Sequence, residues 1–310
     1  AMQIVPTIAG VPSRLTIFQR SPQWTIPNNN YHRELTPQTR LLMEQVPWYA
    51  SWYRLRLMWI YQDKLHATLR RDPEWEHPDR AVNAINDRHR RFFVQHLEKE
   101  IAGHEDRLLD KVLPTYPPYG KRMLIDNGWF AALRRDDVDL VTEKVAAVDE
   151  KGVVLADGSR VDLDVLVMAT GFQSRRMLSP MDIRGRSGQS LREIWGDDDA
   201  HAHLGITVPD FPNLFLVYGP NTNLGHGGSV IFHTECQVSY ITKMLVKMLE
   251  GGVRTVEVRP EVCDDYNRRV DEAHAELVWT HPGMTNWYRN AAGRVVTNSP
   301  WRLVDYWSMT

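Results

Sequence analysis

The chain has 310 residues, of which 43% are hydrophobic, and its 37 basic and 39 acidic side chains leave a net charge of −2. This composition is typical of one large or two ordinary globular domains, and it gives no indication of binding to nucleic acid or to an anionic membrane. No apolar run reaches the roughly 18 residues that a membrane span needs. Two cysteines are too few for a disulfide framework, and the chain does not open with a secretory pattern. We therefore expect a cytoplasmic protein.

Residues 1–33 predict part of a nucleotide-binding unit. Apolar residues from Met2 to Ile8 recur at helical spacing, and Gly10 is a stop signal. "LTIF" at 15–18 then predicts a strand, so this segment has the order of the second half of a βαβ unit. The sequence contains no G-x-G-x-x-G motif. We expect the glycine turn of any dinucleotide site here to precede residue 1.

Residues 34–112 predict a helical insertion. The segment is rich in aromatic residues and arginine, and Trp52, Leu55 and Trp59 recur three and four residues apart. We expect two or three long helices that break near Pro73 and Pro78. The aromatic stripe favours a helical core over a cofactor site.

Residues 113–168 predict a return to the first unit. A short helix at 129–133 and a strand at 137–141 are followed by alternating residues that predict a hairpin turning at Asp157-Gly158. The apolar run from Val165 to Met168 predicts a buried strand. It ends in Ala169, Thr170 and Gly171, whose short side chains fit either a close cofactor contact or an ordinary turn.

Residues 169–310 predict a second buried strand and a long helix. "NLFLVYGP" at 213–220 is apolar, and it is followed by a glycine-rich loop at 225–228. Ser229 is a helix cap and Gly251 a helix stop, so the segment between them predicts an amphipathic helix. In parallel sheets, ligands bind at the carboxyl ends of strands, and anions bind at helix amino termini.

Five segments occur in the order found in one enzyme family. They are "LTIFQRSPQW", "YPPYGKR", "VMATGF", "FPNLFLVYGPNTNLGHGGSVIFHTECQVSYI" and "TNWYRN". Together they resemble flavin-dependent Baeyer–Villiger monooxygenases, and the glycine-rich segment is most similar to the 4-hydroxyacetophenone monooxygenase branch. The family's amino-terminal FAD glycine fingerprint is absent, so the chain resembles a carboxy-terminal portion of such an enzyme.

The resemblance implies an α/β class: a partial two-dinucleotide-binding-domain, Rossmann-like flavoprotein fold with a helical insertion. Residues 1–33 and 113–168 would belong to the NADP-binding domain. Residues 34–112 would be the insertion, and residues 169–310 the carboxy-terminal part of the FAD-binding domain.

Arg20 is the candidate catalytic residue. It follows the predicted strand at 15–18, a position that in dinucleotide folds contacts the ribose or its 2′-phosphate. The resemblance implies a second role, in which the arginine lies over the flavin and stabilises the negatively charged peroxyflavin. The alternative without a catalytic role is a surface arginine that caps a loop.

Other residues are candidates for cofactor binding. Lys121 and Arg122 would contact a cofactor phosphate, or else form a solvated face. Trp287 matches a family tryptophan near the nicotinamide, with a packed core aromatic as the alternative. The remaining candidates by resemblance are Gln19, Ala169, Thr170, Gly171, Asn223, Gly225 and Gly227. No metal site is predicted, because His226 and His233 have no partners at metal-ligand spacing.

The resemblance implies an enzyme that uses NADPH, FAD and O₂ to convert a ketone into an ester. Two alternatives remain open. The chain could be a cofactor-free folded module that binds or associates with itself as a homodimer through an exposed sheet edge. An N-hydroxylating flavin monooxygenase shares "ATGF" but fits "FQRSPQW" less well.

Overall fold

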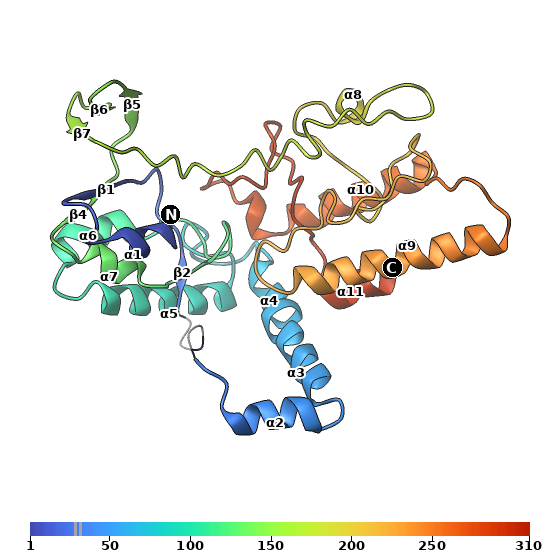
Figure 1. Ribbon diagram of the computed structural model, residues 1–310, viewed down its shortest axis with the longest axis horizontal. Helices are drawn as coiled ribbons and strands as arrows, with labels where there is room; N and C mark the ends of the chain where they lie inside the picture. Colours follow the sequence, from blue (N-terminus) through green and yellow to red (C-terminus); the bar gives the residue numbers. More distant parts are fainter. Residues whose placement is uncertain (28–29, 31–32) are drawn as a thin grey trace. The chain divides into compact units, whose positions relative to one another are not determined.

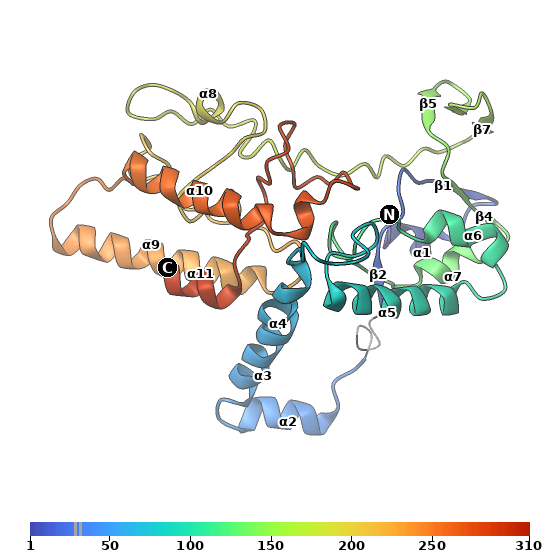
Figure 2. The same cartoon turned by 180° about the vertical axis from the view of Figure 1, so that it is seen from behind.

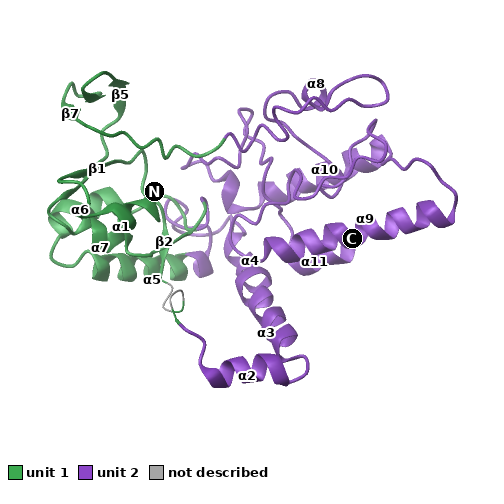
Figure 3. Cartoon of the chain, viewed as in Figure 1, with its two compact units in different colours: residues 1–33, 87–118, 122–172 green, residues 34–86, 119–121, 173–310 purple. Residues whose placement is uncertain are grey.

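The computed structural model describes residues 1–27, 30 and 33–310, and the chain forms two compact units (Figure 3). Unit 1 comprises residues 1–33, 87–118 and 122–172, and unit 2 comprises residues 34–86, 119–121 and 173–310. Residues 28, 29, 31 and 32, in the first predicted segment, lie outside the described residues. The segment predicted as one insertion, 34–112, is divided between the units after residue 86.

Unit 1 is organised by two pairs of parallel strands. β1 (Leu15–Phe18) pairs with β4 (Val138–Val141), and β2 (Thr25–Ile26) pairs with β3 (Leu124–Ile125) (Figure 1). The predicted first helix is present as α1 (Ile4–Ile8). Parallel neighbours cannot be joined by a tight turn, so β1 finds its partner more than a hundred residues later in the sequence.

Three helices build the apolar core of unit 1: α5 (Ala84–Glu100), α6 (Glu105–Val112) and α7 (Trp129–Leu133). Leu97 of α5 and Ile101, which directly follows this helix, share one buried cluster with Phe130 of α7 and Val138 of β4. Figures 1 and 2 show α5 beside α7 from both sides. The helix predicted at 129–133 is confirmed, and it forms here because all but one of its side chains are buried against the sheet and α5.

A small antiparallel sheet completes unit 1. β5 (Val145–Val148), β6 (Gly152–Leu155) and β7 (Arg160–Asp162) pair in sequence order. The turn between β6 and β7 falls at Asp157-Gly158, as predicted, with Gly158 at a φ of +85°. Asp157 accepts hydrogen bonds from Ser159, which closes the turn locally.

Unit 2 contains three helices that share a core. Side chains of α9 (Val230–Glu250), α10 (Pro260–Ala275) and α11 (Leu303–Met309) form a buried cluster that includes Cys236, Tyr266 and Tyr306. Figures 1 and 2 show the three helices side by side. α9 is the predicted amphipathic helix, and the Ser229 hydroxyl accepts the Phe232 amide at its start. Two short helices, α8 (Leu191–Trp195) and η3 (Val278–Thr280), also belong to this unit. No helix in the described part of the chain, α9 included, is long and apolar enough to cross a membrane.

The first part of unit 2 is helical, as predicted, but its aromatic stripe is not a core. α2 (Pro37–Gln45), α3 (Tyr49–Met58), a π-helical turn η1 (Trp59–Asp63), α4 (Lys64–His66) and a 3₁₀ turn η2 (Ala67–Leu69) follow one another. Trp52, Leu55 and Trp59 are 59%, 61% and 54% exposed. The spacing identified an apolar helix face correctly, but spacing alone does not say what covers that face.

The two apolar runs predicted as buried parallel strands are not strands. Residues 165–168 have no regular structure and are exposed, and no strand of the described chain pairs with them. Residues 213–220 form turns and irregular backbone, with Leu216 buried and Val217 and Tyr218 partly exposed. An apolar run becomes a strand only when neighbouring strands pair with its backbone N–H and C=O groups. The sequence of the run itself does not show whether such strands are present. Ala169 to Phe172 are the last residues of unit 1.

The α5 core contact gives a direct test of unit 1. Leu97→Ala should lower the free energy of unfolding by about 2 to 5 kcal/mol, since it leaves a cavity in a packed cluster. Phe92→Ala on the same helix is a matched control, because Phe92 is 54% exposed, and it should change stability by less than about 1 kcal/mol. Urea unfolding followed by circular dichroism measures both, and equal effects would contradict the assigned core.

Candidate functional site

The predicted site residues are divided between the two units. Unit 1 contains Gln19, Arg20, Arg122 and residues 169–171. Unit 2 contains Lys121, Asn223, Gly225, Gly227 and Trp287. Each unit therefore contains its own set of candidate site residues.

A cavity of about 180 Å³ lies at the carboxyl end of β1 in unit 1. Its lining includes Phe18, Gln19 and Ser21 from the strand end, and Trp129 and Phe130 from α7. An apolar wall with a few polar groups at its mouth is the common form of a small-molecule site. The carboxyl end of a parallel strand is also where nucleotides bind in such sheets.

Gln19 is fixed by two hydrogen bonds. Its backbone amide donates to the Val141 carbonyl at 2.8 Å, which extends the β1–β4 pairing by one residue. Its side-chain Nε2 donates to the Lys111 carbonyl at 2.6 Å, at the end of α6. Gln19 thus joins the strand pair to α6 and holds the chain that leads into Arg20.

Arg20 is exposed immediately after this anchored residue. Its guanidinium makes no hydrogen bond or ion pair with any described residue. By contrast, Arg14, before the same strand, pairs with Asp139. A guanidinium offers five donors in a fixed plane, and it binds phosphate or carboxylate through two parallel hydrogen bonds. Arg20 is therefore a cation available to an anionic ligand at the strand end.

The other predicted residues of the first and third segments differ in exposure. Lys121 is half-buried and Arg122 exposed, and both have interaction partners within the chain. Ala169, Thr170 and Gly171 are exposed. Gly171 has a φ of +86°, but a Cβ placed there would meet nothing within 4 Å. Its backbone conformation, rather than a close neighbour, accounts for glycine at this position.

Asn223 belongs to a hydrogen-bond network in unit 2. Its side-chain amide donates to Asn298 Oδ1 at 2.5 Å, and its Oδ1 accepts from the Tyr218 hydroxyl at 2.6 Å. Its backbone bonds with Thr297 and Ser299 on the same returning segment. Asn298 could not be predicted as the partner of Asn223, because the two asparagines lie 75 residues apart.

The glycines of the 225–228 loop are packed against other parts of the chain. A Cβ on Gly225 would lie 2.4 Å from the Asn298 amide nitrogen, and one on Gly227 would lie 2.6 Å from the Tyr61 carbonyl oxygen. Gly227 also has a φ of +148°. Both positions therefore need glycine for contacts inside the protein, whatever else the loop binds.

Two buried histidines of unit 2 are held neutral. The His233 ring stacks on Tyr306 with 3.7 Å between ring centroids, and burial lowers the pKa of His233 to about 3. Burial likewise lowers the pKa of His274 to about 3, although its Nε2 lies 3.0 Å from the Asn298 carbonyl. Desolvation disfavours the imidazolium, so these side chains serve packing rather than proton transfer near neutral pH.

Trp287 presents its ring to solvent while resting on a buried neighbour. It is 43% exposed, and its ring centroid lies 4.4 Å from that of Tyr288, which is fully buried. The Tyr288 backbone is fixed in turn by bonds to Asn286 and Val296. Trp287 is thus an exposed aromatic face on a rigid support, which a flat ligand could stack against.

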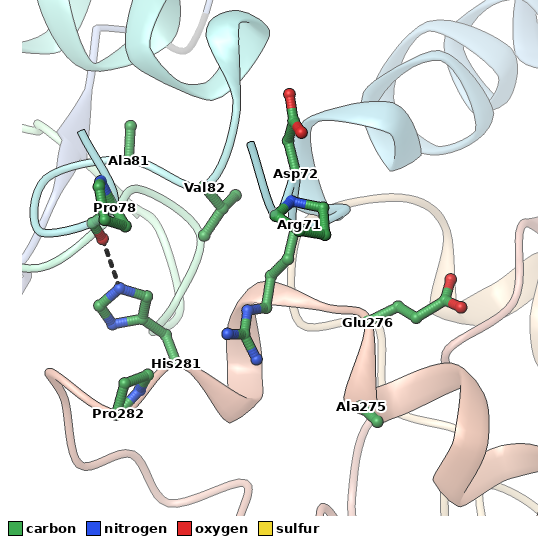
Figure 4. A pocket seen from close by; sticks show the side chains of 10 residues that line it. Arg71, Asp72, Pro78, Ala81, Val82, Ala275, Glu276, His281 and Pro282 are labelled. Carbon is green, nitrogen blue, oxygen red and sulfur yellow. Dashed lines mark hydrogen bonds between the residues drawn. The ribbon is translucent and has the colours of Figure 1, made fainter. Parts of the chain in front are cut away.

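A second cavity, of about 390 Å³, lies within unit 2 (Figure 4). His281 Nε2 donates to the Pro78 carbonyl at 2.6 Å, and its Nδ1 accepts from the Gly283 amide at 3.1 Å, so both ring nitrogens are engaged and the ring orientation is fixed. The Arg71 side chain extends between His281 and Glu276 in Figure 4, and Glu276 pairs with Arg70. None of the site residues that were predicted from the sequence lines this cavity. Its lining includes Arg71, Asp72, Pro78, Val82, Glu276 and His281.

Proteins named as monooxygenases match this chain along nearly its whole length. An uncharacterised monooxygenase of Sinorhizobium fredii is 45% identical over 309 residues, which are 100% of this chain and 46% of that protein. A Baeyer–Villiger monooxygenase of Streptomyces coelicolor is 31% identical over 99% of this chain and 56% of that protein. The chain thus spans about half the length of the curated relatives it matches. No protein-family model matches it.

Solved structures share the fold. A steroid monooxygenase bound to NADP superposes with a TM-score of 0.77 at 23% identity, over 99% of this chain and 61% of that one. A closed cyclohexanone monooxygenase gives a TM-score of 0.74 at 22% identity. The chain is related to the Baeyer–Villiger monooxygenases. Its two units have the partial, Rossmann-like flavoprotein fold of that family, which confirms the predicted fold class.

The two buried histidines of this chain predict that its folded state loses stability in acid. Unfolding restores the pKa of His233 from about 3 toward its ordinary value of 6.5, so the unfolded chain binds the proton first. The stability that neutral His233 contributes is present above about pH 6.5 and is lost as pH falls toward 3. His233→Phe should therefore reduce the loss of unfolding free energy between pH 7 and pH 5 by about 1 to 2 kcal/mol. Urea unfolding at both pH values measures this.

The exposed His77 provides the control for this measurement. His77→Phe should alter the difference in stability between pH 7 and pH 5 less than His233→Phe does, because the His77 side chain is already in water in the folded chain. If His233→Phe and the parent chain lose the same free energy on acidification, burial of a neutral His233 is not a source of the pH dependence.

Proposed function

We propose that the protein to which this chain belongs is an FAD- and NADPH-dependent monooxygenase that converts ketones into esters. Similarity along the whole chain to proteins named Baeyer–Villiger monooxygenase carries the proposal. It is supported by an unpaired arginine at the carboxyl end of a parallel strand. Two free, buried cysteines suit action in the cytoplasm.

The described residues of unit 1 fit an NADP phosphate. Arg20 offers an unpaired planar cation. The residues before and after it in the sequence, Gln19 and Ser21, line the cavity. Gln19 is tied to Val141 and Lys111, so the approach to Arg20 is fixed before any ligand arrives. A binding group that is already positioned loses less entropy when its ligand binds. Relatives in this fold have been solved with NADP and with FAD.

The described residues of unit 2 fit a flat ring system. Trp287 is an exposed aromatic face on the buried Tyr288. Asn223 lies on a braced segment before the glycine-rich loop. In the proposed enzyme FAD supplies the oxygen-activating chemistry when bound, and these residues orient the ring systems. Lys121, Arg122 and residues 169–171 are proposed as further cofactor contacts.

The proposed substrate class is a ketone, with O₂ as co-substrate. One relative is named cyclohexanone 1,2-monooxygenase, and one structural neighbour was solved with cyclohexanone bound. The likeness of the glycine-rich segment to the 4-hydroxyacetophenone branch favours an aryl ketone within that class.

Arg20 separates the two half-reactions in this proposal. In the FAD-loaded enzyme, Arg20→Ala should reduce ester formation by roughly 10²- to 10³-fold, because a fixed cation beside developing negative charge contributes about 3 to 4 kcal/mol. Reduction of the flavin by NADPH should persist, with a higher NADPH requirement if the guanidinium also binds phosphate. Arg20→Lys should rescue poorly, since an ammonium lacks the planar fork.

Arg14→Ala is the matched control, because Arg14 lies before the same strand and is exposed but paired with Asp139. It should leave both half-reactions near the parent rate. Gas chromatography of the ester and stopped-flow absorbance of the flavin give the two readouts. Ester formation by Arg20→Ala at the parent rate would remove Arg20 from the catalytic role.

A second proposal, self-association, rests on the exposed face of α3. Trp48, Trp52, Leu55 and Trp59 are all more than half exposed, and soluble chains seldom leave such a set uncovered. Under this proposal a second copy of the chain covers it. Light scattering should show a dimer that Trp52→Glu converts to monomer, whereas Phe92→Glu on α5 should not. A colourless chain that stays colourless with added FAD would favour this proposal over the enzymatic one.

A further inference from the structure

A histidine and two carboxylates meet in unit 1 outside the sites already described. His96 and Glu100 lie four residues apart on α5, and Asp126 follows β3. One ligand atom from each lies within 4.8 Å of the other two. Residues four apart on a helix share one face, so α5 presents two potential metal ligands side by side.

The third ligand is held in place by the backbone. The Asp126 amide donates to the Ile26 carbonyl at 3.0 Å, which continues the β2–β3 pairing. Asp126 Oδ1 accepts the Trp129 amide at 3.0 Å at the start of α7. The other carboxylate oxygen, Oδ2, lies 3.4 Å from His96 Nε2. Asp126 is therefore oriented toward His96 by contacts that need no ligand.

Within the described chain, no lysine or arginine forms an ion pair with the carboxylates of Glu100 or Asp126. The Arg134 guanidinium donates to the Glu100 backbone carbonyl at 2.9 Å. The charge partner of each carboxylate is His96, whose Nδ1 lies 4.0 Å from Glu100 and whose Nε2 lies 3.4 Å from Asp126. The side chains of His96, Asp126 and Glu100 are 13%, 10% and 30% exposed. Carboxylates withdrawn from water are normally paired or bound to a metal ion.

His96 Nε2 is a buried atom that makes no hydrogen bond of good geometry in the described part of the chain. It is directed at a carboxylate oxygen across 3.4 Å, a separation close to that between two ligands of one tetrahedral ion with bonds of about 2.0 to 2.2 Å. A neutral imidazole nitrogen and two carboxylates form a common set for divalent metals.

We propose that His96, Glu100 and Asp126 bind one divalent transition-metal ion, with Zn²⁺ the best fit to this ligand set. Water would complete the coordination, as in sites with three protein ligands. The ion would join the carboxyl end of α5 to the turn between β3 and α7, two elements that contribute Leu97 and Phe130 to the core of unit 1. Its role is the stability of unit 1, and the proposal is independent of flavin chemistry.

Calorimetric titration of the chelator-treated chain with Zn²⁺ tests the proposal. The parent chain should bind one ion that raises the melting temperature, and Co²⁺ at the same site should give visible absorption bands. Glu100→Gln and Asp126→Asn should each weaken this site by more than about 10-fold. Asp126→Asn keeps an oxygen for the Trp129 amide, so loss of that contact does not explain its effect. His96→Gln should abolish the Co²⁺ bands.

His89→Gln controls for general histidine binding, since His89 lies on the same helix α5, and it should leave the site intact. Circular dichroism of each variant shows whether it is folded. The proposal is overturned if the parent chain binds no Zn²⁺ at 100 times the protein concentration. It is equally overturned if all three ligand variants bind as the parent does. In either case the three side chains would form only the contacts seen between them in the folded chain.

Discussion

The parallel pairing of β1 with β4 is the contact on which the candidate NADP site depends. It joins Leu15–Phe18 to Val138–Val141 across more than a hundred residues, so it has to be stabilised by the core beneath it rather than by local turns. That core is supplied by α5 and α7. The Gln19 amide extends the pairing by one bond, and Arg20 is the first residue beyond it. The position of the proposed cation is thus a consequence of strand register.

Unit 2 is organised differently, by buried polar contacts between distant segments. Asn223 and Asn298 bond to each other, and the Asn298 carbonyl also meets His274, which burial keeps neutral. Buried polar groups of this kind are costly unless each finds a partner, and once paired they fix a single arrangement. The glycine-rich loop packs against this network at Gly225 and against the Tyr61 carbonyl at Gly227, and neither position leaves room for a side chain.

Elements with local causes could be predicted from the sequence. α7, α9 and the β6–β7 turn have caps, stops or turn residues within a few positions of their ends, and each lies where it was expected. Apolar runs whose structure depends on distant partners were predicted wrongly: residues 165–168 and 213–220 have no pairing strands in the described chain, and the α3 stripe is exposed. The same limit applies to the site. Arg20 was predicted as a candidate from its motif. Asn298 and the His96 cluster could not be predicted, because they depend on contacts between residues that lie tens of positions apart in the sequence.

We propose that unit 1 binds NADP at the end of β1, and hydrogen–deuterium exchange of the purified chain with and without NADP⁺ is the sharpest test of this binding. Backbone amides of residues 17–25 should exchange more slowly with the dinucleotide, because ordered contacts at Gln19 and Arg20 suppress local opening. The β5–β7 sheet of the same unit should be unaffected and serves as an internal reference. The account predicts protection confined to the strand end and weakened by Arg20→Ala. Unchanged exchange in residues 17–25 at saturating NADP⁺ would contradict it.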